Sequence, residues 1–165
     1  MHGMTAPWLD SMTPVGPPAV TSPSMKNLLY AATLTGSWSG ILCLVVYLIG
    51  RLLGVPFEVA TSSGAALTVI PWLTVLLVPV AAAFAAALLA SLVRGQRAAG
   101  RIVFWLGTLI AAASCLVPIM QPSGVIWSTR ILLIAMHAIT WLLVVPQIAR
   151  IVGDSEPGQH VDANA

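Results

Sequence analysis

The stretch WSTRILLIAMHAITWLLVVPQIAR, residues Trp127–Arg150, decides the fold of this chain. It is an apolar run long enough to cross the roughly 30 Å hydrocarbon core of a membrane as a helix. It carries an arginine near its start, Arg130, and a histidine seven residues later, His137. Ionisable groups inside a membrane are costly and usually face other helices or water. The stretch therefore predicts a membrane helix with a polar face turned toward neighbouring helices.

The composition of the whole chain favours a membrane protein. Of its 165 residues, 58% are hydrophobic and only 7% are charged, whereas soluble domains carry about 25% charged residues. Lipid is the solvent that suits such a composition. The net charge of +2 is too small to indicate binding to nucleic acid.

Four hydrophobic runs predict an all-α, four-helix transmembrane bundle with up-down topology. The predicted domain covers residues 26–150, with spans at about 27–49, 69–93, 102–120 and 128–150. The proline-rich residues 1–25 and the polar residues 151–165 are predicted to be disordered cytoplasmic tails. The connection formed by residues 50–68 holds Glu58, and one interpretation of it is a short amphipathic segment at the membrane interface.

Small residues predict close helix packing in the first two spans. Gly36 and Gly40 lie four residues apart in the first span, and the second span contains AAAFAAALLA at residues 81–90. Such surfaces let the backbones of two membrane helices approach closely. Pro79, inside the second span, is expected to bend its helix because it removes a backbone hydrogen bond.

The loop RGQRAAGR at residues 94–101 carries three arginines and no acid, which indicates a cytoplasmic position. With this loop inside, both termini are inside as well. Two basic residues, Arg51 and Arg130, then lie outside. We therefore predict a multi-pass protein of the cell inner (plasma) membrane with both termini cytoplasmic. Five basic residues would lie inside: Lys26, Arg94, Arg97, Arg101 and Arg150.

His137 is predicted to lie near the middle of the bilayer, with Arg130 about two turns nearer the outer surface. Serine and cysteine side chains of the first and third spans fall at a similar depth, namely Ser39, Cys43, Ser114 and Cys115. Glu58, the only acidic residue between Asp10 and Asp154, is expected near Arg130. The predicted ligand-binding residues are Arg130, His137, Ser114, Glu58 and Ser39.

Two interpretations of this polar cluster remain open. In the first, a neutral His137 makes hydrogen bonds between helices and Arg130 extends to the lipid headgroups. In the second, the cluster lines an outward-facing pocket for a ligand, a lipid headgroup or a proton. Cys43 and Cys115 are expected to behave as small hydrophobic residues. A disulfide between them is possible in principle, but such bridges usually lie in exposed loops outside the cell.

Enzymatic and cofactor chemistry are not expected from these residues. The spans contain no Asp or Glu. Ser114 and His137 can be drawn as a nucleophile and its base, but no group that would stabilise an oxyanion accompanies them. A metal held by His137 and soft sulfur ligands is disfavoured, because Met136 precedes His137 directly and points about 100° away. Haem would need a second membrane histidine, and His2 and His160 lie in the tails.

The chain resembles a group of small actinobacterial membrane proteins of uncharacterised function. The resemblance covers about residues 26–150 and rests on the four spans, the arginine-rich loop, Ser114 and Pro118, and the segment Thr129 to Ala135-Met136-His137. It implies a four-helix membrane fold, and it implies no activity.

We therefore hold two hypotheses. The first is a non-enzymatic membrane protein that acts by association, as a homo-oligomer or as an accessory subunit of an envelope complex. Its motivation is the small-residue faces of the first two spans. The second is a small-ligand or lipid-binding protein, or a transporter subunit, with an outward-facing polar pocket around Arg130 and His137.

Overall fold

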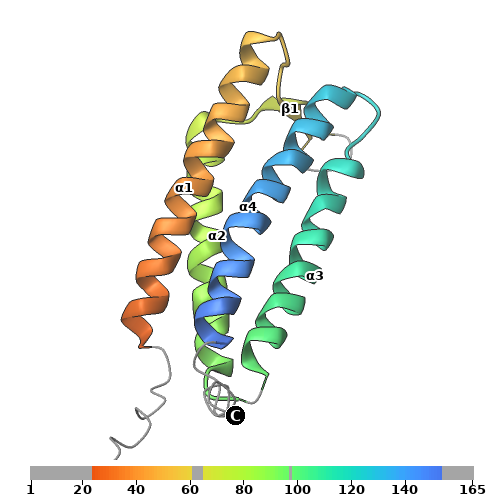
Figure 1. Ribbon diagram of the computed structural model, residues 1–165. Helices are drawn as coiled ribbons and strands as arrows, with labels where there is room; N and C mark the ends of the chain where they lie inside the picture. Colours follow the sequence, from red (N-terminus) through yellow and green to blue (C-terminus); the bar gives the residue numbers. More distant parts are fainter. Residues whose placement is uncertain (1–23, 61–64, 97, 154–165) are drawn as a thin grey trace, which may run out of the picture.

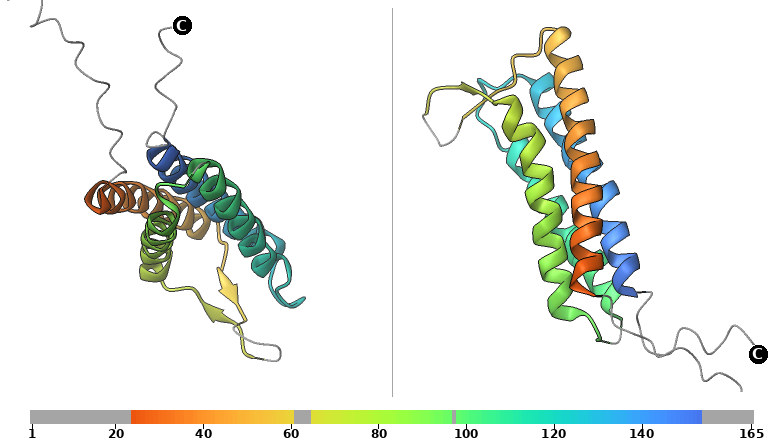
Figure 2. Two further views of the ribbon diagram at one scale, coloured as in Figure 1. Left: turned by 90° about the horizontal axis from the view of Figure 1, so that it is seen from below. Right: turned by 90° about the vertical axis from the view of Figure 1, so that its left-hand side faces the viewer.

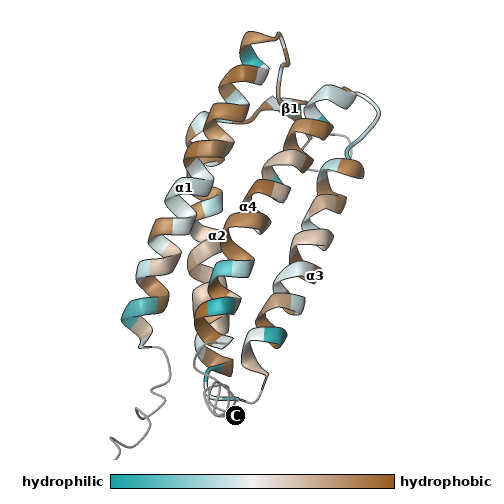
Figure 3. Cartoon of the chain, in the orientation of Figure 1, coloured by the Kyte–Doolittle hydropathy of each residue, from teal (hydrophilic) through white to brown (hydrophobic). Residues whose placement is uncertain are grey.

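The computed structural model describes residues 24–60, 65–96 and 98–153 and confirms the four-helix bundle. The helices run alternately up and down, so that α1 begins at the same end of the bundle at which α4 finishes (Figure 1). All four helices are long and apolar enough to cross a membrane, and most of their length consists of hydrophobic residues (Figure 3). The helices are α1 (Met25–Leu52), α2 (Trp72–Val93), α3 (Ala99–Ile119) and α4 (Trp127–Gly153).

The two ends of the bundle differ in charge and in structure. One end holds Lys26, Arg94, Arg101 and Arg150, and we call it the basic end. The other end holds a short hairpin between α1 and α2, and we call it the hairpin end. Figure 2 shows the hairpin projecting sideways from the bundle near the start of α2.

Several predicted boundaries differ from the observed ones. Helix α1 begins at Met25, where the Ser24 hydroxyl accepts a hydrogen bond from the Asn27 backbone as a helix cap. Helix α4 continues to Gly153 instead of ending at 150. Helix α2 begins at Trp72 instead of 69, because Pro71 has extended backbone angles and the preceding residues pair as a strand. The remainder of the predicted tails, residues 1–23 and 154–165, lies outside the described residues.

A β-hairpin stands where a short amphipathic segment was expected. Strand β1 (Glu58–Val59) pairs in antiparallel fashion with β2 (Thr68–Val69). Phe57, directly before β1, is fully buried and lies against the Tyr47 ring at a centroid distance of 4.6 Å. The Tyr47 hydroxyl donates to the Ile70 carbonyl oxygen at 2.9 Å. These contacts hold the hairpin against α1.

The glycines of α1 allow this helix to pack closely against α2. A Cβ atom added at Gly40 would lie 2.5 Å from the Leu76 carbonyl oxygen, and one added at Gly36 would lie 2.9 Å from the Ala83 Cβ. Ala83 and Ala87 of α2 are completely buried. The small residues predicted to promote close packing therefore do so within the chain.

Helix α3 is held mainly by α4. A Cβ atom added at Gly107 would lie 2.8 Å from a methyl group of Val145, and the Trp141 indole donates to the Thr108 hydroxyl at 3.0 Å. Only Ala99 and Pro118 of α3 are buried. Helices α2 and α3, although consecutive in the chain, contact each other far less than either contacts its main partner. The bundle is therefore least closed between α2 and α3.

Candidate functional site

A cavity of about 540 Å³ occupies the space between α2, α3 and α4. Its lining extends from Thr74 to Val93 on α2, from Ile102 to Ser114 on α3 and from Leu133 to Ile148 on α4. At about 1.5 Å per residue, the α2 portion alone is roughly 28 Å long, close to the roughly 30 Å thickness of a bilayer core. We call this space the α2–α3 cavity.

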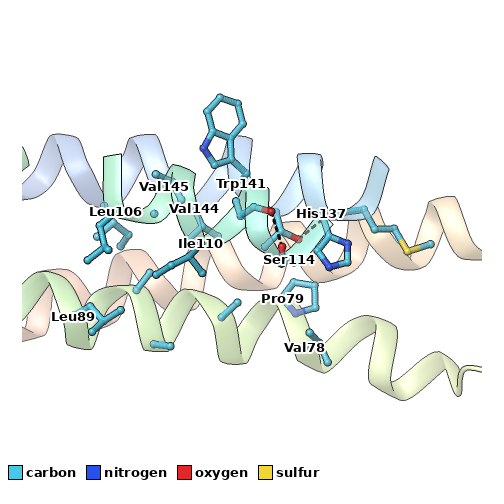
Figure 4. A pocket seen from close by; sticks show the side chains of 18 of the residues that line it. Val78, Pro79, Leu89, Leu106, Ile110, Ser114, His137, Trp141, Val144 and Val145 are labelled. Carbon is cyan, nitrogen blue, oxygen red and sulfur yellow. Dashed lines mark hydrogen bonds between the residues drawn. The ribbon is translucent and has the colours of Figure 1, made fainter. Parts of the chain in front are cut away.

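The walls of the α2–α3 cavity are almost entirely apolar. Helix α2 contributes alanines, leucine, valines and Pro79, and α3 contributes isoleucines, leucine and Gly107. Polar side chains lie among them, including Ser114 of α3 and His137 and Thr140 of α4. Figure 4 shows the His137 ring and Ser114 among the lining residues, with Pro79 of α2 facing them.

His137 is fixed by its own helix. Its Nδ1 atom lies 2.7 Å from the Leu133 carbonyl oxygen, one turn earlier in α4. A carbonyl oxygen only accepts, so Nδ1 carries the proton and a neutral ring presents Nε2 as an acceptor. No hydrogen bond to Nε2 is found in the described part of the chain. The ring therefore makes no interhelical hydrogen bond there, in contrast to the first interpretation of the sequence.

Ser114 and His137, predicted to lie at one depth, line the same cavity. They are not paired as nucleophile and base, since the Ser114 hydroxyl donates to the Ala111 carbonyl oxygen at 2.7 Å. Within the described ranges, no hydrogen bond joins Ser114 to His137.

Ser39 belongs to a different contact, the interface of α1 with α4. It is fully buried, and its hydroxyl donates to the Thr140 hydroxyl at 3.0 Å. Thr140 donates in turn to the Met136 carbonyl oxygen at 2.9 Å, and the Cys43 thiol lies 3.5 Å from the same oxygen. This small network connects two helices and ends at the wall of the α2–α3 cavity, which Cys43 and Thr140 also line.

Arg130 is bound to backbone at the hairpin end and does not line the cavity. Its Nε, Nη1 and Nη2 atoms donate to the carbonyl oxygens of Val125, Ile119 and Pro122 at 3.1, 3.0 and 2.8 Å. Its guanidinium carbon lies 4.9 Å from the centre of the Trp127 ring, and only 8% of the residue is exposed. The guanidinium thus binds the carbonyl of Ile119, the last residue of α3, which a helix leaves unpaired, and two carbonyls of the connection between α3 and α4.

Glu58 is not brought to the predicted cluster. It lies half-buried in β1, opposite Val69. The described residues show no ion pair between Glu58 and Arg130. The expected extension of Arg130 to the headgroups is likewise not observed, because the guanidinium is buried and three of its N–H groups donate to carbonyl oxygens of the protein.

Cys43 and Cys115 are both free thiols. They lie on α1 and α3, which are separated by α4 (Figure 1). No group of three or more His, Cys, Asp or Glu residues is found among the residues that the structure describes.

The sequence interpretation missed the contribution of α2. The alanine run predicted to pack on a neighbour has two faces: Ala83 and Ala87 are buried in the bundle core, and Ala82 and Ala86 line the cavity. It also missed Thr140, one turn before Val144 and one turn after Met136 on α4. The helical spacing of Met136 and Thr140 places them on one face, but nothing in the sequence says which helix that face meets.

Residues 23–154 match a family of unknown function, DUF6069. The chain belongs to this family. The match covers the whole bundle of this DUF6069 member and agrees with the expected likeness to proteins of uncharacterised function. The actinobacterial source in that resemblance stays a prediction. No curated protein and no solved structure matches the chain.

Proposed function

We propose that this DUF6069 member is a non-enzymatic membrane protein that binds a lipophilic molecule in the α2–α3 cavity. The supporting observation is the cavity itself: its volume of about 540 Å³ falls within the roughly 300–1,000 Å³ typical of ligand sites. Like such sites, it combines apolar walls with a few polar groups, here His137 and Ser114. The cavity lies beside His137, as the ligand-binding hypothesis requires, but Arg130 and Glu58 are not part of it.

The length and the walls of the cavity suit a chain-like apolar molecule. Its lining is almost entirely apolar and runs roughly 28 Å along α2, close to the thickness of a bilayer core. An extended hydrocarbon chain can enter from the surrounding bilayer between α2 and α3, which contact each other little.

Photolabelling tests this proposal. The full chain in lipid nanodiscs would be irradiated with a hexadecane that carries a diazirine, and labelled residues would be located by mass spectrometry. We expect labels on cavity-lining residues, and we expect Ala111→Trp to remove them because an indole would fill the space. Leu109→Trp is the matched control, since Leu109 is 64% exposed on α3 and does not line the cavity. Equal labelling of cavity residues in both variants would contradict the proposal.

Association remains the alternative function. The small-residue faces that suggested it are used inside the chain, but α3 has only two buried residues and leaves most of its surface uncovered. That surface suits a second copy or a subunit of an envelope complex as well as lipid. Native mass spectrometry in mild detergent would reveal a dimer or a co-purifying subunit, and a strict monomer would argue against this alternative.

We also propose that the basic end is cytoplasmic, with the protein in the plasma membrane. Four basic residues of the described chain lie at this end, and Arg51 and Arg130 lie at the other. The guanidinium of Arg130 is bound to carbonyls of the protein, so it counts less than a free charge when the basic residues of the two ends are compared. A membrane-impermeant maleimide should label Ser123→Cys in intact cells, and Gln96→Cys only after lysis, both in a chain with Cys43 and Cys115 replaced by alanine. The reverse pattern would show the opposite orientation.

A further inference from the structure

The polar atoms around the middle of the α2–α3 cavity accept hydrogen bonds and have no donor left to give. The proton on His137 Nδ1 is used by the Leu133 carbonyl oxygen, which leaves Nε2 as an acceptor. The Ser114 hydroxyl proton is used by Ala111. Each of these side chains retains lone pairs toward any molecule in the cavity.

The other donors near this point are also committed. The hydroxyl of Thr140 donates to the Met136 carbonyl oxygen, and the Cys43 thiol lies within reach of the same oxygen. The Trp141 indole donates to Thr108. Thr74 differs, because its exposed hydroxyl makes no side-chain hydrogen bond in the described chain. It lies five residues before Pro79, at the hairpin end of the lining.

An acceptor surface in apolar walls selects the chemistry of its ligand. An ether, ester or ketone offers only acceptors, so it would leave His137 Nε2 without a partner. An anion would need donors or a cation, and Arg130 lies outside the cavity. A cation would need a carboxylate, and the only acidic residue between Asp10 and Asp154 is Glu58 in the hairpin. A neutral hydroxyl group meets none of these objections.

We propose that the ligand of the α2–α3 cavity is a neutral membrane-soluble alcohol or phenol whose O–H donates to His137 Nε2. Its hydrocarbon body lies along the alanine-rich wall of α2 and the apolar wall of α3. The Ser114 oxygen, on the neighbouring helix α3, is the second acceptor available to the same hydroxyl group. This inference rests on the proposed function, since it names the class of molecule that the cavity takes.

A pair of matched probes tests the inference. The full chain in nanodiscs would be photolabelled with a diazirine-bearing hexadecanol and, separately, with its methyl ether. The two probes share the hydrocarbon chain and differ in the single donor. We expect the alcohol to label cavity residues about ten times more strongly at equal membrane concentration. In His137→Phe, which keeps a ring of similar size without the acceptor, the alcohol should lose most of its preference over the ether.

The outcomes separate this inference from the proposed function. If the wild-type chain is labelled in the cavity equally by alcohol and ether, the hydroxyl selectivity is refuted while lipophile binding stands. If neither probe labels the cavity, both proposals fail. Should His137→Phe not fold, Ser114→Ala provides a second variant, for which a smaller but measurable loss of preference for the alcohol is expected. An unchanged preference in both folded variants would overturn the assignment to these two side chains.

Discussion

Helix α2 forms two unlike contacts with its neighbours. Toward α1 it presents Ala83, against which Gly36 packs so closely that an added methyl group would not fit. Toward α3 it presents Ala82 and Ala86, and there the helices leave a cavity of about 540 Å³. The same residue type closes one interface and lines an open space at the other. What differs is the partner, because α1 brings glycines to α2 whereas α3 directs its only close glycines toward α4.

The comparison predicts that a bulkier side chain at the α1–α2 interface lowers the stability of the protein most. In Gly40→Leu the new Cβ would overlap the Leu76 carbonyl oxygen, which is backbone and cannot rotate away. We expect a loss of about 3 kcal/mol or more in the free energy of unfolding, at the upper end of overpacking costs. Thermal unfolding in detergent would measure it. Thr33→Leu, on an exposed position of α1, is the control and should be nearly neutral.

The next largest effect is expected where α3 is fastened at the hairpin end. Arg130→Leu removes three hydrogen bonds to carbonyl oxygens, and we expect a loss of about 2–3 kcal/mol because hydrogen bonds of charged groups are strong. Arg130→Lys should recover part of this loss, since a lysine cannot reach three diverging acceptors at once. Arg51→Leu serves as the control, because Arg51 is exposed and makes one such bond, to Pro56. Equal unfolding temperatures for Arg130→Leu and Arg51→Leu would contradict the assigned role.

Two neighbouring alanines on α2 give the most direct comparison. Ala87→Leu adds bulk where the residue is completely buried, and we expect a loss of about 1–3 kcal/mol. Ala86→Leu adds the same bulk on the cavity side, and we expect a change within about 0.5 kcal/mol together with weaker photolabelling of the cavity. Ala87→Leu should therefore lower the stability, whereas Ala86→Leu should leave the stability nearly unchanged and lower the labelling of the cavity. If both variants lost stability equally, the cavity would be a packed interface.

The smallest effect is expected at the α1–α4 network. Ser39→Ala removes the hydrogen bond to Thr140 and should cost about 0.6 kcal/mol, the average for such bonds between membrane helices. Ser37→Ala is the control on the same helix. Chemical unfolding in mixed micelles has the resolution to separate the two. A loss above about 2 kcal/mol for Ser39→Ala would mean that the network is central to stability.

The candidate site was predicted in part, because helical spacing fixes depth but not direction. Counting residues placed His137, Ser114 and Ser39 at one level, and the structure brings the first two to one cavity. Ser39 instead donates to Thr140 at the interface of α1 with α4, and it does not line the cavity. Arg130 was expected to face water or lipid headgroups. Instead it donates to the carbonyl oxygens of Ile119, at the end of α3, and of Pro122, in the loop that follows. Nothing in the sequence indicates that Arg130 would bind these two residues.

By itself, the sequence determined four segments that are long and apolar enough to cross a membrane as helices, because apolar length and the cost of exposing backbone in lipid leave few other structures. Because consecutive spans that each cross the membrane once must alternate in direction, the sequence also determined that the helices run up and down. The tertiary structure alone decided that the glycines of α1 pack against α2 and that α3 packs mainly against α4. It also decided that a cavity lies between α2, α3 and α4. Inside a membrane every helix face is similarly apolar, so hydrophobicity does not choose neighbours, and the fit of small side chains against backbone does.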